Sequence, residues 1–487
     1  MRKGLIFLCM ILLTLLVGCD ITNRTEPEKE GKVPTNDFTI DEYYQDGAII
    51  QQQKDFVIKG ESEEGVLIKA TLYDQNGYIV KQLSDIVDAK GNYQITMPAP
   101  EASFNEYHLL ITDSVHTKKI EHLLFGEVWM LMGERMATVE REVPQDATSG
   151  LMFLKNTNIG LLWCDETSNL VYNLAIDLGH KLLKKLNVPV AIVDATLLSG
   201  HADTWLNRDV ASKHKVILNY LTKLGRDTLL ENDHINADEP GSMYSSYLEP
   251  LKDHAFKGIW WSQGQSDFQD LTEEEYQQTS YNYSYLITQI FSDSIFSENS
   301  LEFFTIQEDY EQKAYSNALR SAQATCAYQL NNMGIIPTYD LVEITPDEEN
   351  PENDPIISFD YDGYVDRIYD ITYENAYRAK KNYFAPAYVN IVANQENITI
   401  SFNTGVVIEK VDEIKGLMVI DSKGEKIEYE FSITNNYLYL TLDLTEEQLE
   451  AGNEYTISYA QDEALYLGNL KATTGIPVLP FIININE

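Results

Sequence analysis

Two polar side chains with the chemistry of an ester-cleaving site follow predicted strands of this chain. His201 comes after the apolar run 190–193, and Ser266 comes after the apolar run 258–261. Loops that follow parallel strands share one edge of the sheet, where a hydroxyl and an imidazole can act as nucleophile and base in acyl transfer. A rebuilt Ser266–His201 pair is therefore one hypothesis. We favour a simpler one, with Ser266 in local hydrogen bonds and His201 at the surface, because the sequence indicates neither their apposition nor an orienting carboxylate.

These loops belong to a central block, residues 125–386, in which apolar strands alternate with long helical segments. One helix carries a leucine at every fourth position, and Thr272 with Glu275 forms a capping box at the start of another. This alternation predicts a doubly wound parallel α/β sheet. The predicted strands are 128–132, 190–193, 258–261 and 303–306, and the leucines are Leu170, Leu174, Leu178, Leu182 and Leu186.

Short alternating apolar segments separated by turns lie on both sides of this block. In residues 38–124, turns such as Asp74-Gln75-Asn76-Gly77 recur at the spacing of a small antiparallel sandwich. Residues 387–487 return to the same pattern, so we expect an N-terminal β-sandwich and a C-terminal all-β domain. The strands predicted in the second block are 389–393, 398–402, 417–420, 427–431, 437–442 and 455–459.

Three segments at the ends of the central strands share their order and several residues with one hydrolase family. Residues 125–133 are Phe-Gly-Glu-Val-Trp-Met-Leu-Met-Gly, residues 188–205 run from Val-Pro-Val to Trp205, and residues 257–267 include Ser-Gln-Gly-Gln-Ser-Asp. They resemble the blocks G-E-V-W-L-C-S-G-Q-S-N-M, V-P-x-G-L-I with W-G-G-T-P-I-E-A-W, and W-Y-Q-G-E-S-N of the sialate O-acetylesterases, members of the SGNH hydrolase superfamily. With weaker matches at both ends, the resemblance covers about residues 41–485. It implies an SGNH-hydrolase-like fold and a carbohydrate O-acetylesterase ancestry.

The catalytic residues of that family are not matched. Where the family has Gly-Gln-Ser-Asn, this chain has Gly133-Glu134-Arg135-Met136, so the nucleophilic serine is missing. The nearest hydroxyl, Thr138, has no bend motif to present it. The family's D-x-x-H pair falls on Asp366 and Tyr369, ahead of a helix expected at 372–384. A phenol titrates near 10, which is too high for a base at neutral pH.

The resemblance also identifies the positions that would stabilise an oxyanion. The asparagine of the third block is Asp267 here, and its carboxylate would repel a developing negative charge. The family's paired glycines fall on Leu198-Ser199, or on Gly200 if the loop shifts by one residue. Backbone N–H donors survive in either alignment.

Together these assignments predict a geometry. Asp366 should lie beside Tyr369 and accept a hydrogen bond from Arg135, Tyr369 or a backbone N–H, because a carboxylate in a cleft is costly unless paired. Arg135 has two interpretations of equal weight, as a bidentate anchor for a carboxylate or sugar and as an ion-pair partner of Glu134, Glu140 or Asp267. The residues expected to meet at the carboxyl edge of one sheet are Gly133, Arg135, Gly200, Asp267 and Tyr369.

The N-terminus has the features of a secretion signal. Met1-Arg2-Lys3 precedes an apolar run, 5–17, that is too short to span a bilayer. The run ends in Leu16-Val17-Gly18-Cys19, which resembles the lipobox of bacterial lipoproteins. We therefore expect a signal peptide over 1–18, a lipidated Cys19 and a flexible tether over 19–37. The alternative is an ordinary signal peptide that happens to contain a cysteine.

Composition limits the partners. The chain has 36 Lys and Arg against 76 Asp and Glu, a net charge of −40, which excludes nucleic acid as a partner because phosphates would be repelled. Hydrophobic residues make up 44%, as in a globular protein. After removal of Cys9 and lipidation of Cys19, only Cys164 and Cys326 remain, and a disulfide and two buried thiols are both open.

The remaining motifs have simple explanations. Residues 360–366 match part of a calcium loop, but the other ligands are absent and we favour an acidic surface turn. Residues 343–355 are interpreted as a surface insertion. The five tryptophans could stack on sugars, but those within strands are expected in the core. No cofactor and no metal is predicted.

The sequence therefore predicts a lipid-anchored protein of the bacterial cell envelope, on the outer side of the plasma membrane or on an outer membrane. Its esterase-like centre is expected to be degenerate, leaving a glycan-binding or structural role. The alternative is an active carbohydrate O-acetylesterase with relocated catalytic groups. A glycan is the candidate ligand, the lipid anchor would hold the protein at a membrane, and the sequence does not identify protein partners.

Overall fold

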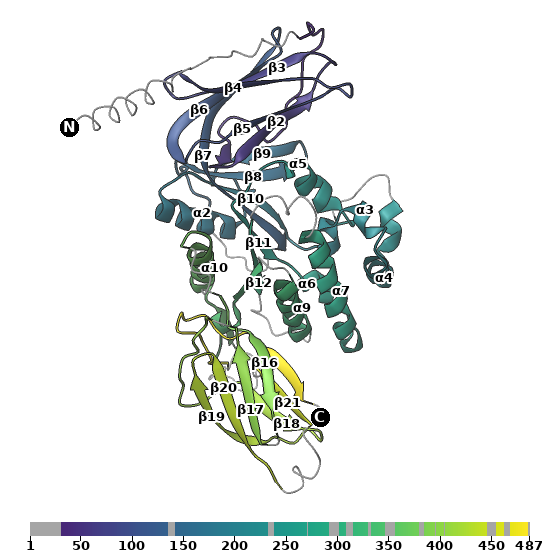
Figure 1. Ribbon diagram of the computed structural model, residues 1–487, viewed down its shortest axis with the longest axis vertical. Coiled ribbons are helices and arrows are strands. Elements are labelled where there is room, and N and C mark those ends of the chain that lie inside the picture. Colours follow the sequence, from purple (N-terminus) through teal and green to yellow (C-terminus); the bar gives the residue numbers. More distant parts are fainter. Residues whose placement is uncertain are drawn as a thin grey trace, which may run out of the picture.

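The computed structural model describes most of the chain from residue 31 onward. The predicted signal peptide, Cys19, Arg135 and Thr138 lie outside the described residues. Three parts follow one another in Figure 1: a β domain, a central α/β domain and a second β domain. The described ranges are 31–134, 142–231, 238–269, 271–291, 301–307, 315–329, 333–345, 356–378, 384–394, 396–403, 405–445, 454–461 and 468–485.

The N-terminal domain is built mostly from antiparallel strands, with one parallel pair of β1 and β7, around a core of apolar residues such as Phe56, Ile68 and Leu109. Strands β2 and β5 pair with each other, while β4, β3, β6 and β7 follow one another in the larger sheet. The strands are β1 (Ile49–Gln51), β2 (Asp55–Glu61), β3 (Leu67–Tyr73), β4 (Ile79–Ile86), β5 (Asn92–Pro98), β6 (Ser103–Thr112) and β7 (Thr117–Glu134).

Strand β7 belongs to both the first and the second domain. The sequence predicted a strand over 128–132 that belongs to the central block alone, but the structure has a single strand of 18 residues that begins in the N-terminal domain. Gly126 looks like a break in the sequence, but it lies within the strand. A Cβ at this position would stand 2.0 Å from the carbonyl oxygen of Pro189, so only glycine fits there. The glycine therefore marks a close backbone approach. Because β7 is one continuous strand, the N-terminal domain is joined directly to the sheet that carries the candidate site.

The central sheet has the order β13-β12-β11-β7-β10-β8-β9. Its neighbours are parallel from β13 to β8, and only β9 runs antiparallel to β8. From β7 the chain passes to β8 and β9 at one edge and returns to β10, which lies between β8 and β7. It then crosses to β11 on the other side of β7, so the strand order reverses beside β7. The strands are β8 (Leu151–Thr157), β9 (Gly160–Cys164), β10 (Val190–Leu197), β11 (Gly258–Ser262), β12 (Glu302–Gln307) and β13 (Met333–Pro337).

Helices cover both faces of this sheet (Figure 1). Helices α2 (Asn173–Leu186) and α10 (Tyr361–Ala376) pack on one face, and α4 (Lys215–Lys223), α7 (Glu273–Phe291) and α9 (Ser316–Gln329) lie on the other side. The α/β class of the central domain, between two β domains, is thereby confirmed. Shorter helical segments are η1 (Ala202–Trp205), α3 (Arg208–Ala211), η2 (Asp227–Glu231), η3 (Tyr244–Leu248), α5 (Glu249–Leu251), α6 (Gln265–Phe268) and η4 (Tyr339–Leu341).

The helix boundaries agree only in part with the prediction. The capping box is present, since the Glu275 carboxylate accepts hydrogen bonds from the backbone N–H of Thr272 at 2.9 Å and from its hydroxyl at 2.8 Å. Leu170 lies before α2 and is exposed. The predicted boundaries of the helix at 372–384 are wrong, because α10 spans Tyr361–Ala376 and so begins 11 residues earlier. Its buried positions are mostly aromatic or β-branched, which obscured the helical period.

The C-terminal domain is a sandwich of a four-stranded and a three-stranded antiparallel sheet around a shared apolar core. The strand positions predicted from the sequence agree with those observed to within about three residues. Between the two domains lies a short hairpin, β14 (Val342–Thr345) and β15 (Ile356–Phe359). The sandwich strands are β16 (Tyr388–Ala393), β17 (Asn397–Phe402), β18 (Leu417–Asp421), β19 (Glu428–Thr434), β20 (Tyr437–Asp443), β21 (Tyr455–Tyr459) and β22 (Phe481–Ile485).

Several smaller alternatives are also decided. The five tryptophans are buried, so none is offered at the surface for sugar stacking. Cys164 and Cys326 are both free thiols. The acidic segment at 360–366 starts α10, with the Asp360 side chain capping the N–H of Gly363, and is not a calcium loop. Among the described residues no cluster of side chains is fit to hold a metal ion, and no helix is long and apolar enough to cross a membrane.

Candidate functional site

The carboxyl ends of β7, β10 and β11 form the part of the sheet where the strand order reverses. Gly133 of β7 lies opposite Thr196 of β10 and Ser262 of β11. Gly133 has a φ of 101°, and a Cβ there would stand 1.9 Å from the Ser262 carbonyl oxygen. Only glycine fits such a close approach. In a doubly wound sheet this edge is where ligands bind, so we take it as the candidate functional site.

A buried carboxylate, that of Glu134, occupies the centre of this edge. Its oxygens accept hydrogen bonds from the backbone N–H of Gly264 at 3.0 Å and of Ser266 at 3.2 Å. A third N–H, that of Gly200, lies 3.3 Å away, and the Ser266 hydroxyl also donates to the same carboxylate. The side chain is 4% exposed. Backbone donors that converge on one point are what an acyl-transfer enzyme offers to an oxyanion, and here a protein carboxylate already receives them.

Gly264 sets the direction of two of these donors. It has a φ of 135°, a conformation that residues with a side chain rarely adopt, and it caps the short helix α6. A Cβ at this position would stand 2.3 Å from Leu319 of α9. The glycine therefore lets the chain turn sharply after β11 and aim its N–H groups at Glu134.

Ser266 is held by hydrogen bonds that include no imidazole. Its hydroxyl contacts the Glu134 carboxylate, lies 3.0 Å from the hydroxyl of Ser199, and accepts from the N–H of Gly200 at 3.2 Å. Ser266 is buried, whereas Ser199 is exposed. Among the hydrogen bonds of the described residues none joins Ser266 to His201. The hypothesis of a rebuilt Ser266–His201 nucleophile and base therefore lacks the contact that it needs.

Asp267 serves as an acceptor that ties two loops together. Its carboxylate accepts from the N–H of Ala202 at 3.1 Å, from the hydroxyl of Tyr220 at 3.2 Å and from the side chain of Gln263 at 3.1 Å. The His201 ring nitrogen Nδ1 lies 3.7 Å from the same carboxylate, which is longer than a hydrogen bond. Asp267 thus fixes the loop after β10 against the turn after β11.

Two further contacts hold these loops in place from behind. Arg226 forms a buried bidentate ion pair with Asp203 of η1, with N–O distances of 2.6 and 2.8 Å. The hydroxyl of Tyr283 on α7 donates to the carbonyl of Gln263 at 2.8 Å. Sequence reasoning singled out none of these residues, because their importance depends on contacts between segments that are distant in the chain.

Electrostatics at the site favour neutral or cationic groups over anions. Burial, together with the nearby Asp267, raises the pKa of Glu134 above its ordinary value, and the hydrogen bonds that it accepts only partly offset this. Burial opposes protonation of His201, but the Asp267 carboxylate outweighs it and raises the pKa of this imidazole. The negative charge of a carboxylate at this edge would repel a developing oxyanion.

Asp366 and Tyr369 do not join this cluster. Both lie inside α10 and not ahead of it, because the helix starts earlier than the sequence indicated. Tyr369 stacks on Tyr373 at 5.8 Å and packs against the core under α2, while the exposed Asp366 pairs with Lys181 of α2. The expectation that Asp366 would be held by Tyr369, Arg135 or a backbone N–H is therefore corrected, since its partner is a surface lysine.

No histidine of this chain can take the position of the family's catalytic base, whichever way the C-terminal part is aligned. The sequence has 8 His, and none follows His254. The resemblance places the family's base after the third block, beyond residue 267. The absence of an imidazole from that whole segment does not depend on which register is chosen.

The structure thus brings Gly133, Gly200, Ser266 and Asp267 together, with His201 beside them. Arg135 and Thr138 lie outside the described residues. The residue that sequence reasoning undervalued is Glu134, which it treated only as a partner for Arg135. Its position directly after Gly133 at the end of a buried strand was the available signal.

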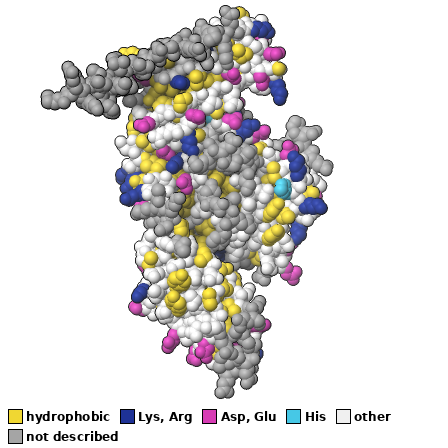
Figure 2. Space-filling model, in the orientation of Figure 1, with side chains coloured by type: hydrophobic (Ala, Val, Ile, Leu, Met, Phe, Trp, Pro, Cys, Tyr) yellow, Lys and Arg dark blue, Asp and Glu magenta, His cyan; other side chains and the backbone are white. Residues whose placement is uncertain are grey.

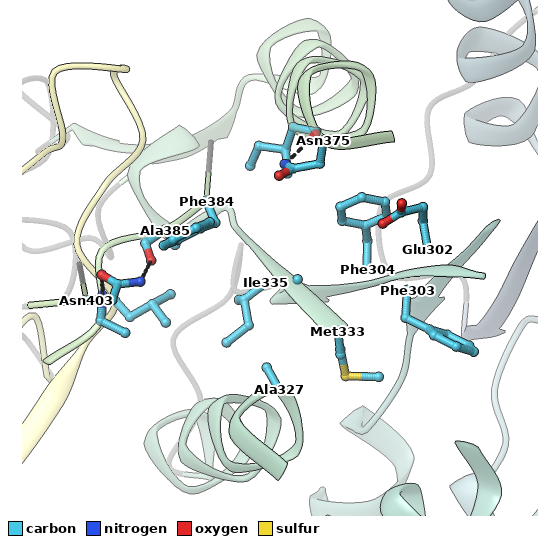
Figure 3. Close-up of a pocket in the computed structure, with 14 residues that line it drawn as sticks. Glu302, Phe303, Phe304, Ala327, Met333, Ile335, Asn375, Phe384, Ala385 and Asn403 are labelled. Atoms are coloured by element: carbon cyan, nitrogen blue, oxygen red, sulfur yellow. Dashed lines mark hydrogen bonds between the residues drawn. The ribbon is translucent and has the colours of Figure 1, made fainter. Parts of the chain in front are cut away.

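A cavity of about 510 Å³ lies elsewhere, beside the C-terminal domain (Figure 3). Its wall includes Phe303 near the start of β12 and Met333 at the start of β13, which belong to the amino edge of the sheet. Phe384 and Asn403 close it from the side of the C-terminal domain. Because ligands of an open α/β sheet bind at the carboxyl edge, this cavity is separate from the candidate site.

The overall arrangement is found in a known hydrolase. No protein-family model and no curated protein matches this chain. Among solved structures, the chain is similar to XAC1771, described as a novel carbohydrate acetylesterase from Xanthomonas citri, with a TM-score of 0.66 and 18% sequence identity. The match covers 92% of this chain and 99% of that one. At this identity the likeness shows the fold.

Other solved esterases are more remote. NanS matches with a TM-score of 0.28 and 13% identity, over 44% of this chain and 77% of its own. A family two carbohydrate esterase from Cellvibrio japonicus matches with a TM-score of 0.26 and 9% identity, over 66% of this chain and 88% of its own. Neither of these two likenesses is close enough to carry an argument about this chain.

Proposed function

We propose that this protein is a cell-envelope lipoprotein with an SGNH-hydrolase-like fold whose esterase centre has been lost, and that it binds glycans or has a structural role. The observation that carries the proposal is the Glu134 carboxylate, which accepts hydrogen bonds from the N–H groups of Gly264, Ser266 and Gly200. In an ester hydrolase, donors of this kind would be directed at the oxygen of the substrate.

The chemistry of the surrounding residues supports the same proposal. The serine of the family's nucleophile block is Arg135 here, and no histidine follows residue 254. Ser266, which is buried at the sheet edge, has no hydrogen bond to an imidazole among the described residues. Without a base a serine hydroxyl remains a weak nucleophile at neutral pH.

A second candidate function rests on one contact. The hydroxyl of Ser266 donates to the Glu134 carboxylate, whose pKa is raised. The same hydroxyl lies within hydrogen-bond distance of the hydroxyl of the exposed Ser199. Such a carboxylate can take a proton from a hydroxyl. An active carbohydrate O-acetylesterase with relocated groups is therefore the alternative, and Ser266 is its key residue.

An assay of ester hydrolysis by the purified protein distinguishes a lost esterase centre from an active O-acetylesterase. The mature protein is incubated with an aryl acetate and with O-acetylated sialic acid, beside the Ser266→Ala variant and the matched control Ser321→Ala, a serine exposed on α9. The proposal expects no turnover above the uncatalysed rate by any of the three. Turnover by the wild type and by the control that is lost in Ser266→Ala would establish the alternative.

A further inference from the structure

The outward face of the four-stranded sheet in the C-terminal domain carries a pair of exposed aromatic rings. Tyr437 and Tyr439 alternate with buried leucines along β20, so both point away from the core. They are 38% and 39% exposed. Their ring centroids are 6.1 Å apart and their planes differ by 26°. The two rings thus form a continuous aromatic surface on a rigid strand.

Each ring is flanked on both sides by a hydroxyl. Tyr439 lies opposite Thr399 of β17 and Ser432 of β19, and side chains that face each other across antiparallel strands point to the same side. The next row has the same order, with Tyr437 between two more hydroxyls, Ser401 and Thr434. We call these six residues the tyrosine face.

Hydroxyl groups on the tyrosine face are available to a ligand. None of the four flanking residues forms a side-chain hydrogen bond with another described residue; they are Thr399, Ser401, Ser432 and Thr434. They are exposed or partly exposed. By contrast, the neighbouring Thr441 at the edge of this surface already pairs with Asn397 at 3.1 Å.

The charge of the surface limits what it can bind. The two rows contain no charged side chain, and the next row along the sheet brings in Glu430 opposite Thr441. The whole chain carries a net charge of −40. Figure 2, drawn in the orientation of Figure 1, shows hydrophobic side chains on this domain, with acidic ones toward its end. A cation is absent from the face, so it offers nothing to a carboxylate or phosphate ligand.

From this arrangement we propose that the tyrosine face is a binding site for a neutral glycan chain. The C–H faces of pyranose rings pack on aromatic rings, and the hydroxyls at their edges exchange hydrogen bonds with serine and threonine. The two rows, hydroxyl–tyrosine–hydroxyl, supply both kinds of contact for adjacent sugar units. The proposal rests on the glycan-binding role proposed above and gives that role a location outside the degenerate centre.

Affinity electrophoresis with soluble polysaccharides tests the location. The mature protein is run through gels that contain neutral polymers (a β-glucan, a xylan, a mannan or a galactan) or an anionic polyuronate, next to the variants Tyr437→Ala, Tyr439→Ala and both together. Each single variant is expected to bind the neutral polymer about tenfold more weakly, and the double variant to migrate as in an empty gel. Tyr437→Phe keeps the ring and should keep most of the retardation.

Two controls keep folding and location apart. Tyr78→Ala removes an exposed tyrosine, 72% exposed, from the N-terminal domain and should bind as the wild type does. Circular dichroism must show the variants folded, which is expected because both tyrosines lie on the outer face. Wild-type retardation that the double variant retains would overturn the proposed site while leaving a glycan-binding protein. Retardation by the polyuronate alone would overturn the proposed site for a neutral glycan while leaving a glycan-binding protein. Absence of retardation by every polymer would overturn both the site and the glycan-binding role, whereas ester hydrolysis tests the lost centre separately.

Discussion

The carboxylate of Glu134 accepts several hydrogen bonds at the sheet edge. The loss in the free energy of unfolding that its removal should cause can be estimated from these contacts. Three backbone N–H groups and one hydroxyl donate to it in a buried environment. A buried donor left without an acceptor costs about 1–3 kcal/mol. Because water can enter the space that Glu134→Ala leaves and take over some of these donors, we expect a net loss of about 3 kcal/mol in the free energy of unfolding.

The raised pKa of Glu134 also predicts how the free energy of unfolding changes with pH. The pKa of Glu134 is raised in the folded state above the ordinary 4.5, chiefly by burial and by Asp267. The folded state therefore holds this proton to higher pH than the unfolded state. The stability that goes with it is complete below the unfolded pKa and is lost as the pH rises through the folded pKa. In Glu134→Gln this loss is absent, so the stability of the variant relative to the wild type should improve as the pH rises from about 4.

Tryptophan fluorescence is the suitable assay, because all five tryptophans lie between residues 129 and 261, in the central domain. Urea unfolding followed at several pH values gives the free energies of the wild type, both variants and the control Glu101→Gln, whose side chain is exposed. A loss below about 0.5 kcal/mol in Glu134→Ala would refute the proposed network. A difference between Glu134→Gln and the wild type that stays constant with pH would refute the raised pKa.

Three other predictions concern residues outside the Glu134 network. Arg226→Ala should lower the free energy of unfolding by about 3–5 kcal/mol, because it leaves the Asp203 carboxylate buried without a partner; a loss within 1 kcal/mol, measured by the same urea assay, would contradict this. In the native protein Cys326 should resist alkylation far longer than Cys164, since burial raises the pKa of the Cys326 thiol to about 12; equal rates by mass spectrometry would contradict it. Cys19→Ser should abolish lipidation and leave the protein released or uncleaved; unchanged mobility and membrane fractionation would contradict the lipoprotein prediction.

The fold was largely predictable because apolar runs and their spacing carry it. Strands such as β10 and β11 are buried along their whole length and therefore appear in the sequence as continuous apolar segments. In the flanking domains the alternation along strands such as β5 and β20 is nearly strict. Where this signal was interrupted, at Gly126, the strand was wrongly divided.

The site was predictable only in its location. Gly133, Gly200 and Asp267 lie near one another because the carboxyl ends of parallel strands share one edge. The role of Glu134 could not be predicted, because it depends on the N–H directions that Gly264 sets at a φ of 135°. The assignment of Tyr369 failed because the helix that contains it has few of the leucines and alanines that make a helical period visible.

Loss of the esterase centre can be tested on the natural class of substrate: release of acetate from O-acetylated sialic acid by the mature wild-type protein is followed by NMR, beside buffer alone and the Ser266→Ala variant. Because the Glu134 carboxylate already accepts the hydrogen bonds of the N–H donors at the sheet edge, we expect the same slow release in all three samples. Release by the wild type well above that of buffer, and absent from Ser266→Ala, would contradict the loss of the esterase centre.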